Sequence, residues 1–178
     1  MNAALSTEEV RRILEERARA LARAPEADEV EEGATGMLVM RVAKERCAVP
    51  VESVKEIEDL GELTTLPGIP DMWAGLVNLR GSVYPVLALA RYLELGRHEP
   101  VEGARVVVLA AGGMEVALLV DAVEEIRRVA AADVGPLLVD GRGPRSEVFR
   151  GVTADMVSVL DPEALLSAPG LVVDQAAA

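Results

Sequence analysis

Two apolar runs flank Arg80-Gly81-Ser82 in the stretch Gly75-Leu76-Val77-Asn78-Leu79-Arg80-Gly81-Ser82-Val83-Tyr84-Pro85-Val86-Leu87. Such runs, separated by a three-residue link that contains Gly, predict a β-hairpin, because Gly81 can adopt the positive φ that a short turn requires. Arg80 is then expected at the turn, where its guanidinium can reach a carboxylate or a carbonyl of a partner. An arginine at a turn is also an ordinary solvated surface residue. The residues alone leave both roles open for Arg80.

Further pairs of strand-like runs surround this hairpin along the chain. They lie at residues 37–49, 105–120 and 148–160, and each pair is interrupted by a short turn signal. Short strands that recur with turns about every eight to twelve residues predict barrels or a sandwich rather than βαβ units. Because 51% of the residues are hydrophobic but only 2% are aromatic, the core must consist of Val, Leu, Ile, Ala and Met. The sequence therefore predicts a mainly β protein with a few short helices.

The first 34 residues are expected to form a separate element. Ser6-Thr7-Glu8-Glu9 fits a capping box, and an amphipathic helix is predicted over residues 7–23 because apolar residues recur there at helical spacing. The apolar stripe of this helix includes Val10, Ile13, Leu14 and Leu21. Residues 25–34 are rich in Pro, Ala, Gly and acidic residues, which predicts a linker. Packing on the chain's own domain and docking on a partner both stay open for the helix.

The composition excludes some classes of binding partner and indicates the cellular compartment. A net charge of -12 argues against nucleic acid and anionic lipid, because phosphate binding requires clustered Lys and Arg. Cys47 is the single cysteine and is expected to be a small core residue in a reducing compartment. The N-terminus lacks a basic region followed by an apolar stretch, and uninterrupted apolar runs are too short to span a membrane. We therefore expect a cytoplasmic protein without membrane insertion.

Residues suited to catalysis or cofactor binding are scarce. His98 is the single histidine and lies in a polar link, which argues against a Ser-His-Asp or Cys-His arrangement. The sequence contains no Gly-rich phosphate-binding loop with a following Lys, and one Cys with one His makes a poor metal-ligand set. Asp155 and Asp161 flank a strand-like run but occupy positions typical of turn and helix-cap residues. We therefore expect no enzyme activity, no cofactor and no metal site.

Several short motifs follow one another in a fixed order over residues 35–167. They are Val49-Pro50 with Val54-Lys55-Glu56-Ile57, then Leu66-Pro67-Gly68, the hairpin at 75–86, Ala117-Leu118-Leu119-Val120-Asp121-Ala122-Val123, and Arg150-Gly151-Val152 with Leu160-Asp161. In this order and spacing, the chain resembles the CheW family of bacterial chemotaxis adaptors. The resemblance implies that residues 35–167 form two packed, five-stranded SH3-like β-barrels, preceded by the helix and linker of residues 1–34 and followed by a tail at 168–178.

The resemblance also implies a function without catalysis. Adaptors of this family bind the cytoplasmic tip of a methyl-accepting chemoreceptor and the regulatory domain of a CheA-type histidine kinase. By this resemblance the expected receptor-binding residues are Val54, Glu56, Gly75, Asn78, Arg80 and Gly81. The Glu56 carboxylate is expected to pair with the Arg80 guanidinium in a groove between the barrels.

The chain departs from the family pattern in two places. Ala88 stands where the family usually has Asp after its Pro-Val strand, and the helix at 7–23 lies outside the family core. The resemblance therefore leaves open a coupling module of a pilus or other non-flagellar chemosensory pathway. A small-molecule-sensing β-barrel module is a further alternative.

Overall fold

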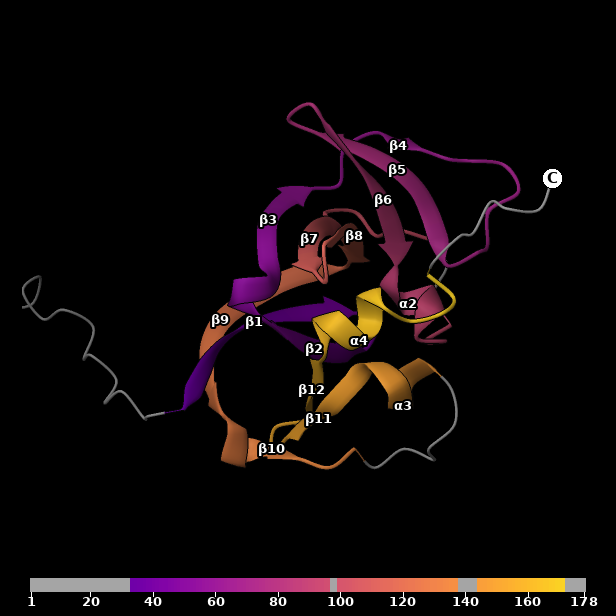
Figure 1. Ribbon diagram of the computed structural model, residues 1–178. Helices are drawn as coiled ribbons and strands as arrows, with labels where there is room; N and C mark the ends of the chain where they lie inside the picture. The colour runs from indigo at the N-terminus through magenta and orange to yellow at the C-terminus, as the bar shows by residue number, and fades with distance from the viewer. Residues whose placement is uncertain (1–32, 97–98, 138–143, 172–178) are drawn as a thin grey trace, which may run out of the picture. The chain divides into compact units, whose positions relative to one another are not determined.

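The computed structural model describes residues 33–96, 99–137 and 144–171. The helix predicted at 7–23, most of its linker, His98 and the tail beyond Leu171 lie outside the described residues. Within them the protein is mainly β, with two sheets and a few short helices, which confirms the predicted fold class (Figure 1).

The elements follow one another in two similar series along the chain. The first series is β1 (Ala34–Val42), β2 (Glu45–Pro50), the 3-10 turn Val51–Ser53, β3 (Val54–Asp59), β4 (Leu63–Thr64), β5 (Trp73–Leu79), β6 (Ser82–Ala88) and α2 (Leu89–Tyr92). The second series is β7 (Arg105–Ala111), β8 (Met114–Val120), β9 (Ala122–Ala130), the 3-10 turn Ala131–Asp133, β10 (Val134–Gly135), α3 (Pro144–Val148), β11 (Phe149–Thr153), β12 (Val157–Leu160) and α4 (Pro162–Leu166).

Each sheet takes strands from both series. The first sheet has the order β10-β11-β12-β2-β1-β9, and the second has the matching order β4-β5-β6-β8-β7-β3. In each sheet one strand has two residues and the other five have four or more, in line with the predicted five-stranded barrels. The hairpin that opens each series therefore pairs with strands of the other series, so neither lobe is a continuous piece of chain.

The β5–β6 hairpin that the sequence predicts is present, but its loop is shorter than expected. Leu79 pairs with Ser82, so the loop contains only Arg80 and Gly81. Their φ angles of 51° and 90° are both positive, as a type I′ turn requires. The Gly81 N–H donates a hydrogen bond of 2.9 Å to Asn78 Oδ1. The left-handed conformation costs a non-glycine residue about 1 to 2 kcal/mol, so Arg80 is not the residue that the turn itself favours.

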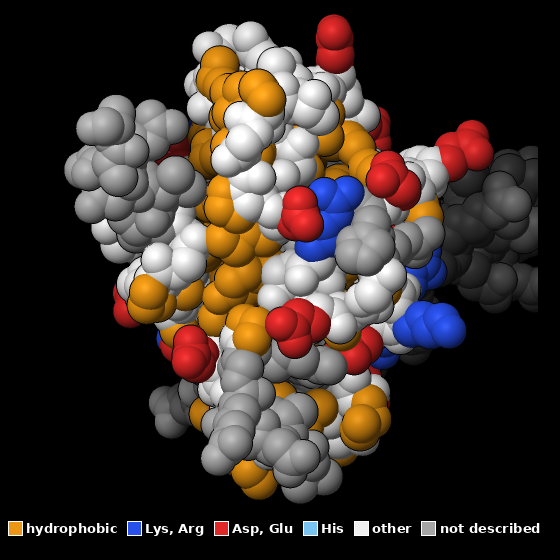
Figure 2. Space-filling view, turned by 90° about the vertical axis from the view of Figure 1, so that its right-hand side faces the viewer, with side chains coloured by type: hydrophobic (Ala, Val, Ile, Leu, Met, Phe, Trp, Pro, Cys, Tyr) orange, Lys and Arg blue, Asp and Glu red, His pale blue; other side chains and the backbone are white. Residues whose placement is uncertain are grey.

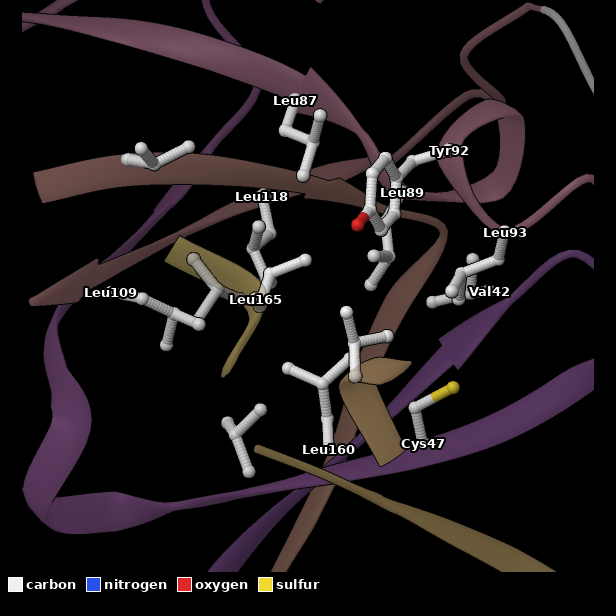
Figure 3. Packing of buried hydrophobic residues seen from close by; sticks show 14 of the residues in the cluster. Val42, Cys47, Leu87, Leu89, Tyr92, Leu93, Leu109, Leu118, Leu160 and Leu165 are labelled. Atoms are coloured by element: carbon white, nitrogen blue, oxygen red, sulfur yellow. The ribbon is translucent and has the colours of Figure 1, made fainter. Parts of the chain in front are cut away.

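The main core lies between the two sheets. Alternate side chains of β1, namely Leu38, Met40 and Val42, face Val107 and Leu109 of β7 and their neighbours in one buried cluster. In Figure 3, Leu109, Leu118 and Leu160 lie together with Leu165 of α4, and Cys47 lies at the same core. Cys47 is fully buried, which confirms its prediction as a core residue.

Each lobe also has a small core of its own. Met37 and Val39, the other alternate residues of β1, pack in a cluster with strands of the first sheet. Val106 and Val108 of β7 do the same in the second sheet. Both faces of β1 and β7 are therefore buried, and this explains why each strand reads as a nearly continuous apolar run.

Asp155 and Asp161 stabilise a turn and a helix end, as predicted. Asp161 is the N-cap of α4: its Oδ1 accepts from the N–H groups of Glu163 at 3.0 Å and Ala164 at 3.1 Å. Asp155 lies between β11 and β12 and accepts two hydrogen bonds from Arg127, at 2.7 and 3.0 Å. The Thr153 hydroxyl also donates to Asp155, at 2.7 Å. These roles account for both carboxylates without any catalytic pairing.

We expect acid to weaken the fold through Asp155. The hydrogen bonds from Arg127, and then from Thr153, hold the pKa of Asp155 well below its usual value of 3.8. A pKa that is lower in the folded than in the unfolded chain gives stability that is fully present above the unfolded pKa and is lost as the pH falls below it. Asp155→Asn should therefore lower the free energy of unfolding in urea at neutral pH and reduce its further loss on acidification.

A second substitution in the same turn serves as the control. Ala154→Ser removes no charge, so its pH dependence should match that of the unchanged protein. Equal losses of stability between neutral and acid pH in Asp155→Asn and in the unchanged protein would contradict this role of Asp155.

Candidate functional site

The charged part of the candidate site is the Arg80 turn. Arg80 Nη2 forms a hydrogen-bonded ion pair with Glu58 Oε1 of β3, while 77% of the Arg80 side chain stays exposed. The pair predicted with Glu56 is therefore wrong. One guanidinium nitrogen is held by Glu58, and the rest of the group faces solvent.

The register of β3 explains why Arg80 pairs with Glu58 and not with the predicted Glu56. Glu56 pairs with Val108 and Glu58 with Val106, so the two glutamates lie on the same strand face, about 6.5 Å apart along the strand. The tip of the β5–β6 hairpin meets β3 at the Glu58 end. Sequence alternation places both glutamates on one face but does not say at which of them the hairpin ends.

A second ion pair joins β3 to β8. Lys55 Nζ lies 2.8 Å from both carboxylate oxygens of Glu115 and 5.5 Å from the centroid of the Tyr84 ring. The hydrogen bond to Glu115 is the largest cause that raises the pKa of Lys55. Lys55 is therefore held as a cation beside Glu115, which also lines the groove described next.

The apolar part of the candidate site is a groove of about 420 Å³ on the second sheet. It is lined by Leu66, Ile69, Trp73, Gly75, Leu76, Pro85, Met114, Glu115, Val116 and Leu171. Leu66 and Met114 are 40% and 38% exposed and lie together in this groove, so they form part of a contiguous apolar patch. Figure 2 shows the side of the molecule that carries the β4–β5 connection, where hydrophobic side chains form a continuous band with acidic side chains on both sides.

The predicted receptor-binding residues do not form one cluster. Asn78, Arg80 and Gly81 lie together at the turn, joined by the Asn78–Gly81 hydrogen bond. Gly75 lines the groove, and Glu56 lies on β3 next to the Arg80 partner Glu58. Val54 begins β3 and packs against the core between the sheets.

Sequence reasoning missed both Glu58 and the groove. The groove residues come from segments far apart in the sequence that meet only after folding, and Leu66, Ile69 and Leu171 belong to loops. No single motif marks them in the sequence. The predicted docking residues of the N-terminal helix, Val10, Ile13, Leu14 and Leu21, lie outside the described residues.

Metal ligands and membrane-spanning helices are the remaining features to consider in the described part of the chain. No group of three or more His, Cys, Asp or Glu side chains there could hold a metal ion. Among the same residues, no helix is both long enough and apolar enough to cross a membrane.

Comparison with known proteins gives consistent matches. A family model described as the CheW-like domain matches residues 36–170. The chain is 32% identical over 98 residues to the chemotaxis protein CheW of Bacillus subtilis, covering 55% of this chain and 63% of that protein. It is 29% identical over 139 residues to a probable chemotaxis protein CheW of Rhizobium etli, covering 76% and 90%. It is 36% identical over 96 residues to protein FrzA of Myxococcus xanthus, covering 54% and 60%.

A solved structure supports the fold. The crystal structure of the scaffolding protein TtCheW from Thermoanaerobacter tengcongensis matches with a TM-score of 0.67 at 22% identity, covering 77% of this chain and 95% of that one. The chain spans less than two thirds of the matched Bacillus subtilis and Myxococcus xanthus proteins.

Two glycines of the predicted site should respond differently to alanine. A Cβ on Gly75, whose φ is 139°, would lie 2.2 Å from the Thr64 carbonyl oxygen, so Gly75→Ala must push β4 away from β5. A Cβ on Gly81 would meet no atom within 4 Å, so Gly81→Ala should cost only the strain of its positive φ, about 1 kcal/mol. Urea unfolding should show a larger decrease in the free energy of unfolding for Gly75→Ala than for Gly81→Ala. Equal decreases would contradict the close packing at Gly75.

The partner of Arg80 can be measured by a double-mutant cycle. Arg80→Ala combined with Glu58→Gln should show a coupling energy of about 0.2 to 1 kcal/mol in urea unfolding, because the pair is exposed. The matched cycle with Glu56→Gln should show almost none. A coupling to Glu56 as large as that to Glu58 would contradict the observed pairing.

Proposed function

Because this chain belongs to the CheW-like domain family, we propose that it is a non-catalytic adaptor that couples chemoreceptors to a CheA-type histidine kinase. The observation that carries this proposal is the family match over residues 36–170, together with relatives that are chemotaxis proteins by name. Such an adaptor works in the cytoplasm beside the receptor array. It has no turnover of its own and acts by binding two partners.

The Arg80 turn suits the receptor side of this function. The guanidinium is exposed and held through one nitrogen by Glu58, so its other N–H groups can reach a receptor carbonyl or carboxylate. Arg80 also adopts a left-handed conformation that Asn or Gly would adopt at lower cost. Because Arg80 costs the fold some conformational free energy at this position, its presence there supports a role in binding.

The adaptor would transmit a signal through differential affinity. If it binds one arrangement of receptor and kinase more tightly than the other, it shifts their equilibrium by that difference in free energy. The residues proposed to contact the receptor all belong to the second sheet or to its β5–β6 turn. They are Val54, Glu56, Gly75, Asn78, Arg80 and Gly81. We assign the kinase to the other lobe, which leaves both partners room to bind at once.

A second candidate is a coupling module of a non-flagellar chemosensory pathway. The observation behind it is that one relative matched at 36% identity, FrzA of Myxococcus xanthus, is not named as a chemotaxis protein CheW. The two candidates differ in the receptor and kinase that are bound and share the adaptor mechanism.

The N-terminal helix is proposed as a separate docking element. Its predicted stripe of Val10, Ile13, Leu14 and Leu21 would bind a partner or a neighbouring copy, since an isolated helix of this length is marginal in water. A chain that lacks residues 1–32, and so keeps β1 whole, should keep its unfolding midpoint in urea. Failure of this truncated chain to fold would show that the segment belongs to the core.

Arg80→Ala should weaken receptor binding much more than folding. Loss of an exposed ion pair changes the free energy of unfolding by about 0 to 1 kcal/mol. Loss of a central interface arginine costs about 2 kcal/mol, or roughly thirtyfold in affinity. Calorimetry with a receptor-tip fragment and with the kinase regulatory domain, measured separately, should show this loss for the receptor alone.

Two further variants make the result specific. Arg80→Asn suits the left-handed turn, so it should fold at least as stably as Arg80→Ala and still lose receptor affinity. Arg105→Ala removes another exposed arginine, paired with Asp59 of β3, and should leave receptor affinity unchanged. Unchanged receptor affinity in a folded Arg80→Ala protein would make Arg80 a plain solvated turn residue.

A further inference from the structure

The strand β9 (Ala122–Ala130) lies at an open edge of the first sheet. Among the described residues it pairs with β1 alone, and no strand lies on its other side. It is the outer strand at the left of Figure 1. An edge strand of nine residues carries a row of backbone N–H and C=O groups that a further strand can bind.

The hairpin between β1 and β2 determines which backbone groups of β1 face β9. Val42 and Glu45 close its two-residue loop, so the N–H and C=O of Val42 and of every second residue before it point to β2. The residues between these point to β9. The Arg41 carbonyl agrees with this direction, because it accepts a hydrogen bond of 2.9 Å from the N–H of Asp121, directly before β9.

The backbone of β9 follows the same alternation. The residues of β1 at positions 39 and 37, which point to β9, lie opposite Glu125 and Arg127. The N–H and C=O of these two β9 residues therefore point back to β1. Because Ile126 lies between them, its N–H and C=O point to the open edge. The Ile126 side chain is also 64% exposed, although one exposed apolar residue is ordinary by itself.

The charges on both sides of Ile126 are complementary to themselves when the strand is reversed. From residue 124 to residue 128 the sequence is Glu-Glu-Ile-Arg-Arg. In an antiparallel pair of two such strands centred on Ile126, Glu125 lies opposite Arg127 of the second copy, and Glu124 lies opposite its Arg128. A parallel pair, or an antiparallel pair shifted by two residues, brings like charges opposite each other, which is destabilising. We propose that two copies of this chain form a two-fold symmetric dimer through β9, with Ile126 on the axis.

The open edge accommodates this arrangement. The two Ile126 residues exchange both of their N–H to C=O hydrogen bonds, as a hydrogen-bonded antiparallel pair does. The register with β1 shifts at Glu124, so the regular ladder between the copies rests on residues 125–127. Arg46 binds Glu124 at 2.8 Å and Glu125 at 3.3 Å, but the two glutamate side chains are 28% and 49% exposed. Their carboxylates can therefore accept from a second arginine.

The same charges make the edge selective. Charged side chains on an edge strand keep unrelated strands away, whereas a second copy of β9 meets each of them with an opposite charge. Both copies use the same surface, so the assembly closes as a dimer and does not continue as a filament. The dimer is independent of receptor and kinase, so its failure would leave the proposed adaptor function untouched.

Cross-linking of Ile126→Cys tests the position of the axis. In a hydrogen-bonded antiparallel pair the two Cα atoms lie about 5.5 Å apart, within the range of a disulfide. Oxidised glutathione takes two electrons and two protons from the two thiols as the disulfide forms, and is itself reduced. The native Cys47 is fully buried, so the new thiol is the reactive one. Val83→Cys is the matched control, because Val83 is 60% exposed but lies on the second sheet.

The Ile126→Cys chain should form a covalent dimer at least about tenfold faster than the Val83→Cys chain, because the dimer holds its thiols at a high effective concentration. Equal rates of cross-linking in the two variants would overturn the proposal.

A charge exchange tests the antiparallel register. Arg128→Glu and Glu124→Arg each place like charges opposite each other at both ends of the ladder, so each variant alone should dimerise less than the unchanged chain. An equimolar mixture restores opposite charges and should form a heterodimer. Sedimentation equilibrium should be run up to about 1 mM, because a short ladder gives a weak dimer, and urea unfolding checks that both variants fold. An unchanged chain that stays monomeric throughout, or a mixture that associates no better than its separate components, would overturn the proposal.

Discussion

Burial of β1 and β7 on both faces is the constraint on which the rest of the structure depends. Alternate side chains of each strand enter the core between the sheets, and the others enter the small core of a lobe. A fully buried Val, Leu, Ile or Met side chain contributes about 1.5 to 3 kcal/mol, so these strands hold three clusters together. Because the opening hairpin of each series pairs with the other series, the lobes cannot separate without loss of these contacts.

This arrangement places both parts of the candidate site on the same sheet. The Arg80 turn and the groove both belong to the second sheet, one at the tip of the β5–β6 hairpin and one around Gly75 and Pro85. The ion pairs Arg80–Glu58 and Lys55–Glu115 connect β3 with the hairpin and with β8. A charged turn and an apolar groove on one rigid sheet suit recognition of a partner surface.

The local sequence pattern was enough to predict the main strands, the hairpins and the burial of Cys47. It also identified Asp155 and Asp161 as turn and cap residues, because turn and cap chemistry depends on near neighbours. The partner of Arg80 depends on where the hairpin tip meets β3, which is a contact between residues 22 positions apart. The groove joins residues from Leu66 to Leu171 and leaves no periodic signal. The sequence did not predict the two-residue type I′ turn, because such turns usually contain Asn or Gly at the position that Arg80 occupies.

The central claim of this account is that one chain binds receptor and kinase at the same time on different surfaces. Sedimentation velocity of the chain mixed with a receptor-tip fragment and the kinase regulatory domain tests it most directly. The account predicts a ternary complex that is heavier than either binary complex and contains all three components. If each partner instead displaces the other from the chain, or neither one binds, the adaptor function proposed here is contradicted.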